Sequence, residues 1–152
     1  MRISVASAVF FLLLAFPTAH AKSNHDDLTL DPAALAQMET RADHAGVREQ
    51  CYLYTELVQV YTEVAGRQMS AGEMEQANTT LKRIQHFAAL IHAALARDTK
   101  HVKDAEKMVH MATYHLDQYM HRVSSEDKDV VESTKKQLDK VHEELLAQVF
   151  AH

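Results

Sequence analysis

The scarcity of helix-breaking residues constrains the fold of this chain more than any other feature. Only three glycines and two prolines occur among its 152 residues, and one of the prolines lies in the apolar N-terminal stretch. Glycine and proline are the residues that most often end helices and form tight turns. The sequence therefore predicts an all-α fold, built from long antiparallel helices with few connections.

The N-terminus has the layout of a cleavable signal peptide. Arg2 precedes an apolar run from Val5 to Phe16, and the small residues Ala19 and Ala21 stand before Lys22. Such a run is too short to span a bilayer as a helix, which needs roughly 20 residues. We therefore expect a signal peptide over residues 1–21, a flexible leader over 22–30, one helical domain over 31–152, and a periplasmic or secreted location.

Capping signals divide the remaining chain into helices. Asp31 before Pro32 predicts a helix start, and this first helix should end near Gly46. A second helix should run from Val47 to about residue 69. Apolar residues recur along it at a spacing of three and four: Leu53, Leu57, Val60 and Val64. Ser70 and Glu73 have the spacing of a capping box, which predicts that a third helix starts there.

The apolar seam of the third helix leaves its end ambiguous. The seam keeps one phase from Ala77 through Leu95 and on to Val123, with only Asp98 interrupting it. The favoured interpretation is one long helix from about 73 to 123, whose exposed seam would invite a homodimer. The alternative breaks the helix at residues 97–99 and folds four helices into an up-and-down bundle. Either way, Ser124 to Asp127 should cap a last helix that reaches about Phe150.

Charge and motif content exclude several classes of function. The formal net charge of −5 lacks the basic stripe of a nucleic-acid binder. Cys51 is the only cysteine, so no intramolecular disulfide is possible, and its thiol should be buried. No nucleophile elbow and no phosphate-binding glycine loop occurs, so we do not expect an enzyme.

Histidine and methionine are frequent, with eleven and seven copies. On the third helix, His101, Met108, Met111 and His115 fall within roughly 80° of one another when 100° is counted per residue. Thioether and imidazole groups suit copper or nickel, so these four are the candidate metal ligands. Met111 and His115, one turn apart, form the nucleus. On the opposite side, Glu106 and His110 are spaced for a helical ion pair.

Two resemblances accompany these patterns. Residues 60–91, with a turn at Gly72 and Ala77 beyond it, resemble one helical hairpin of a tetratricopeptide-type repeat, although no second copy follows at a period near 34 residues. The size, signal and His-Met content resemble stress-induced periplasmic helical chaperones and metal sensors, but their Leu-Thr-x-x-Gln repeats are absent.

The sequence thus favours binding over catalysis. The expected function is an exported helical module that contacts a protein partner, or a second copy of itself, through helix packing. The alternative is a periplasmic copper-binding or nickel-binding protein that uses the four His and Met residues.

Overall fold

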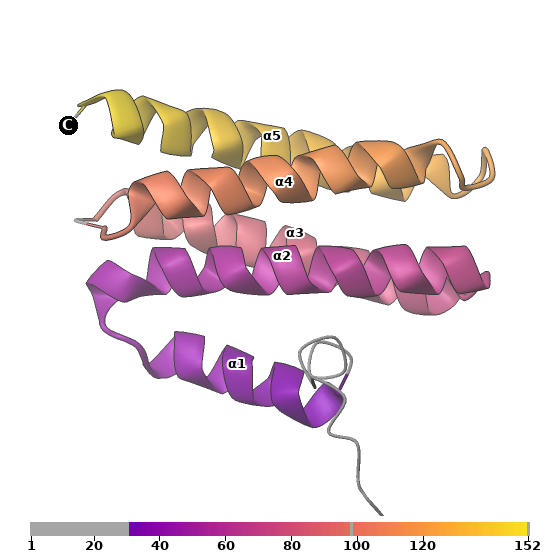
Figure 1. The fold of residues 1–152 in the computed structure, drawn as a ribbon, viewed down its shortest axis with the longest axis horizontal. Helices are drawn as coiled ribbons and strands as arrows, with labels where there is room; N and C mark the ends of the chain where they lie inside the picture. Colours follow the sequence, from indigo (N-terminus) through magenta and orange to yellow (C-terminus); the bar gives the residue numbers. More distant parts are fainter. Residues whose placement is uncertain (1–30, 98, 152) are drawn as a thin grey trace, which may run out of the picture.

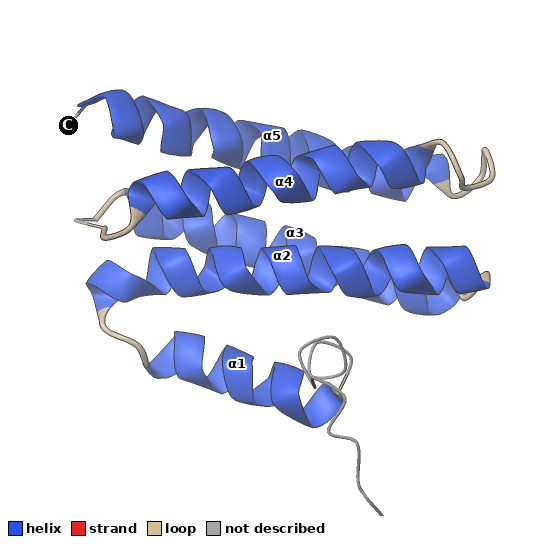
Figure 2. Ribbon diagram, in the orientation of Figure 1, coloured by secondary structure: helices blue, strands red, loops and turns tan. Residues whose placement is uncertain are grey.

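The computed structural model describes residues 31–97 and 99–151, and this part of the chain is helical without any strand (Figure 2). The helices are α1 (Pro32–His44), α2 (Val47–Ala71), α3 (Met74–Leu95), α4 (Val102–Met120) and α5 (Lys128–Ala151). The predicted all-α class with long antiparallel helices is confirmed. The predicted signal peptide and leader lie outside the described residues.

The four longer helices form two antiparallel hairpins that lie side by side. One hairpin is α2 with α3 and the other is α4 with α5; α2 packs against α4, and α3 packs against α5 (Figure 1). Helices α3 and α4 follow one another in the chain but lie on a diagonal of the bundle, where their backbones do not approach closely. The shorter α1 packs on α2. This arrangement makes α2 and α4 parallel neighbours.

The prediction of one helix from about 73 to 123 is wrong. Helix α3 ends at Leu95 and α4 begins only at Val102. His101, at the N-cap of α4, has a φ of 59°, and the N–H of Lys100 donates to the carbonyl oxygen of Arg48 at 2.8 Å. Leu95 and Val102 both pack in the core and stand seven residues apart, so the apolar spacing alone does not reveal the break.

The predicted cap at Asp31 is confirmed, whereas the predicted capping box is wrong. The Asp31 side chain accepts from the N–H of Ala33 at 3.0 Å. The Ser70 hydroxyl instead donates to the Gly66 carbonyl at 2.8 Å, and Glu73 makes no side-chain cap bond. Gly72, with a φ of 78°, closes α2 through a Schellman arrangement of backbone bonds. The glycine that ends α2 therefore determines the conformation of this turn, and the predicted cap of α3 does not form.

All five helices contribute to one buried cluster of apolar side chains. Its largest fully buried members include Leu57, Ile84, Leu116 and Leu138. Cys51 is also buried, as the sequence predicted. Within the described residues, none of the helices has the length and hydropathy needed to cross a membrane.

Aromatic rings and a carboxylate fasten α1 and α3 to α2. Tyr54 and Tyr61 of α2 stack on Phe87 of α3, with ring centroids 6.0 and 5.8 Å apart. The Tyr61 hydroxyl donates to Glu39 of α1 at 2.5 Å, and Arg83 of α3 pairs with the same carboxylate. These contacts join α1, α2 and α3, and α4 packs against α2 in this group.

Candidate interaction face and the adjoining hollow

The outer surface of α4 carries two large apolar side chains in the open. Met111 is 44% exposed and Tyr114 is 54% exposed, and they lie three residues apart on the helix. Lys103, Lys107 and His110 are exposed beside them. At 100° per residue, all five fall within about 100° of the helix circumference. We call this set the α4 face.

The α4 face is exposed because α4 packs into the core with its opposite side. Ala105, Val109, Ala112 and Leu116 are the buried residues of α4. They recur at a spacing of three and four, so they line one stripe, which leaves the opposite side of the helix to solvent. Met111 and Tyr114 therefore lie outside the buried apolar cluster.

The structure separates the predicted metal ligands into two places. His101 stands at the start of α4, its ring 5.2 Å from that of Tyr52, in a cavity of about 550 Å³ between α1, α2 and α4. His115 lies about 20 Å further along the helix. These two histidines cannot bind one ion.

Met108, Met111 and His115 remain within two turns of one another on α4. Met111 is exposed, and Met108 and His115 are partly exposed. Over residues 31–97 and 99–151, no group of three His, Cys, Asp or Glu side chains is placed to hold a metal ion. A site built on methionine sulfur and His115 therefore stays a prediction.

Histidines instead join α5 to its neighbours. His142 of α5 is hydrogen-bonded to Glu106 of α4 at 2.7 Å, and its ring centroid is 5.1 Å from that of His110. The helical spacing suggested that Glu106 pairs with His110, but Glu106 pairs with His142 across the helix interface. His92 of α3 and Glu144 of α5 make a second such bond, also at 2.7 Å. One bond joins α5 to α4 within its own hairpin, and the other joins α5 to α3 of the neighbouring hairpin.

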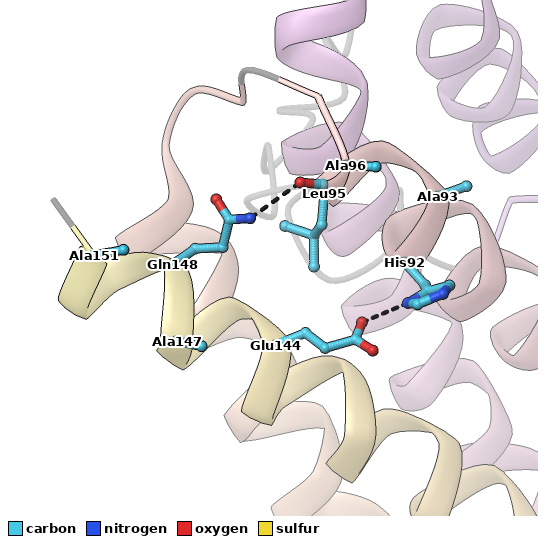
Figure 3. A pocket seen from close by; sticks show the side chains of 8 residues that line it. All are labelled: His92, Ala93, Leu95, Ala96, Glu144, Ala147, Gln148 and Ala151. Carbon is cyan, nitrogen blue, oxygen red and sulfur yellow. Dashed lines mark hydrogen bonds and ion pairs between the residues drawn. The ribbon is translucent and has the colours of Figure 1, made fainter.

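The His92–Glu144 bond crosses a pocket of about 700 Å³ between the ends of α3 and α5 (Figure 3). Next to it, the Gln148 amide donates to the Leu95 carbonyl at 3.0 Å. Much of the remaining lining is alanine methyl groups. Because the polar groups drawn there already bond to one another, this pocket provides little with which to select a ligand.

A further cavity, of about 610 Å³, lies beside the α4 face, between the C-terminal halves of α2 and α4. We call it the α2–α4 hollow. It is lined by Glu63, Gly66, Arg67, Ser70, Ala71, His115, Tyr119 and Arg122. The ring of Tyr119 lies so close to Gly66 that a Cβ atom there would collide with it. The missing side chain of Gly66 thus makes room for the Tyr119 ring against α2.

Charges surround the Tyr119 hydroxyl in this hollow. Burial raises the pKa of Tyr119, and the carboxylate of Glu63 raises this pKa further. The guanidinium groups of Arg122 and Arg67 act in the opposite direction. All three charges are therefore close enough to act on one hydroxyl, which stays protonated at neutral pH.

The sequence predicted only His115 among the residues of the hollow. Gly66 was the available signal, because an isolated glycine inside a helix often has a packing reason. Its partner Tyr119 is far away in the sequence, so the pattern could not show which helix approaches.

Comparison with protein-family models, with curated proteins and with solved structures finds no match for this chain.

Proposed function

We propose that this chain is an exported interaction module that binds a partner protein through the α4 face. The observation that carries the proposal is the adjacent exposure of Met111 and Tyr114 on one side of a helix. Methionine and tyrosine are enriched at protein interfaces, and a few such side chains supply most of the binding energy.

The charges around this pair indicate the kind of partner. Lys103, Lys107 and His110 belong to the α4 face, and Asp104 is the one exposed acid among residues 101–114. An amphipathic helix with acidic flanks complements this surface, its apolar stripe covering Met111 and Tyr114. Binding rather than catalysis is the proposed role, and residues 1–21 are proposed to direct export.

A photo-crosslinking residue placed at Tyr114 tests this proposal in cells that produce the protein. We expect a discrete adduct that disappears when Met111→Asp is added, because the carboxylate disrupts the apolar contact. The matched control position is Lys136, on the outer side of α5, whose side chain is 74% exposed.

Each outcome of the crosslinking decides something. An adduct at 114 and not at 136 supports the proposal, and an adduct of twice the chain mass identifies the partner as a second copy. Equal labelling at the two positions, or no adduct at 114, would overturn it.

A soft metal ion is a second candidate, favoured by the placement of Met111 and His115. One turn separates them, and solvent reaches both. Cuprous ion should then raise the melting temperature of the protein, and this rise should saturate at a fixed ratio of copper to protein. The double variant Met111→Ala with His115→Ala should abolish the rise. Full metal binding by the double variant would exclude this site.

A further inference from the structure

We propose that the α2–α4 hollow is a binding site for an oxyanion, the carboxylate or phosphate group of a small ligand. The proposal concerns a cavity outside the α4 face, so it holds or fails independently of the partner protein.

The hollow gathers two arginine side chains from separate parts of the chain. Arg67 lies on α2, and Arg122 lies in the turn after the C-cap of α4; His115 of α4 also lines the hollow. Arginine has a planar fork of N–H donors that fits the oxygens of a carboxylate or phosphate. The chain as a whole has a net charge of −5, so this local gathering of cations departs from the average surface.

Tyr119 adds a neutral donor at the same place. Its ring lies against Gly66, and its hydroxyl is within electrostatic range of both arginines. A protonated phenol donates a hydrogen bond to an anion without contributing a competing charge. Because the Tyr119 ring is packed against α2, the ordering cost of a bond from its hydroxyl is reduced.

Glu63 is the one carboxylate in the lining. It is spaced four residues before Arg67 on α2, and it acts on Tyr119 in the sense opposite to the arginines. An incoming oxyanion has to compete with this carboxylate. Its removal should therefore strengthen binding, which is the reverse of what a general loss of structure would do.

The test is a titration of the full chain with sodium phosphate and, separately, with sodium succinate, at ionic strength held constant with sodium chloride. Nuclear magnetic resonance would follow the backbone amides of Gly66, Ser70 and Arg122. We expect saturable shifts at these amides. Saturation by phosphate alone or by succinate alone identifies which oxyanion the hollow prefers.

Two substitutions in the hollow should change affinity in opposite directions. Arg122→Gln should weaken binding about tenfold, since a charged donor is lost. Glu63→Gln should strengthen it about threefold, since a competing carboxylate is lost. Arg97→Gln is the matched control, because Arg97 is exposed beyond the end of α3, at the opposite end of the bundle.

Non-saturating shifts with both salts would overturn the proposal. So would weaker binding in Glu63→Gln, or an equal loss of affinity in Arg97→Gln and Arg122→Gln. Circular dichroism checks that each variant is folded, and Arg67→Gln replaces Arg122→Gln if the latter is not.

Discussion

The substitution Leu116→Ala should lower the free energy of unfolding by about 3 kcal/mol. Leu116 is fully buried on the inner side of α4, the helix that packs against both α2 and α5. Truncation removes apolar contact and leaves a cavity, because the neighbouring helices α2 and α5 can only partly close the gap. Urea denaturation followed by circular dichroism measures the change.

The control for this prediction is Tyr114→Ala on the same helix. Tyr114 is 54% exposed, so its loss should change stability by less than about 0.5 kcal/mol. Similar losses in the two variants would contradict the assignment of the inner and outer sides of α4. The same control shows whether a Tyr114 variant that fails to bind a partner is still folded.

Native Cys51 should react with a thiol reagent at least about a hundredfold more slowly than Cys51 in the urea-unfolded chain. Burial raises the pKa of the Cys51 thiol from an ordinary value of 9.0 to about 11. The thiolate is the reactive form, so the reactive fraction at mildly alkaline pH falls by about two powers of ten. Absorbance of the released chromophore gives both rates.

A surface cysteine provides the comparison for that experiment. Gln118→Cys should react quickly in the folded protein, because Gln118 is exposed on α4. Equal rates at positions 51 and 118 would mean that α2 does not bury its thiol. Such a result would contradict the packing of α2 in the bundle.

Local sequence patterns predicted the helices well where the cap or the apolar spacing lies within a single helix. Asp31 with Pro32 marked the start of α1, and the apolar spacing through Leu53 and Leu57 marked α2. The turn between α3 and α4 was missed because it leaves the apolar phase unchanged from Leu95 to Val102. The capping box failed because Gly72 closes α2 first.

The candidate surface was predictable only in part. Helical spacing alone placed Met111 and His115 one turn apart, and the structure keeps them so. The bond between Glu106 and His142 joins residues 36 positions apart, and the contact of Gly66 with Tyr119 spans a longer separation. Such contacts depend on how the hairpins pair, which helical periodicity does not encode.

The α4 face and the α2–α4 hollow both require that α4 folds back beside α2. Spin labels at Glu75→Cys and Gln118→Cys, in a Cys51→Ala background, test this directly by pulsed electron paramagnetic resonance. The start of α3 and the end of α4 lie at the same end of the bundle (Figure 1). We predict a label separation under about 30 Å, the span of closely packed helices with their labels. A separation near 65 Å, the length of one continuous helix between these positions, would contradict the account.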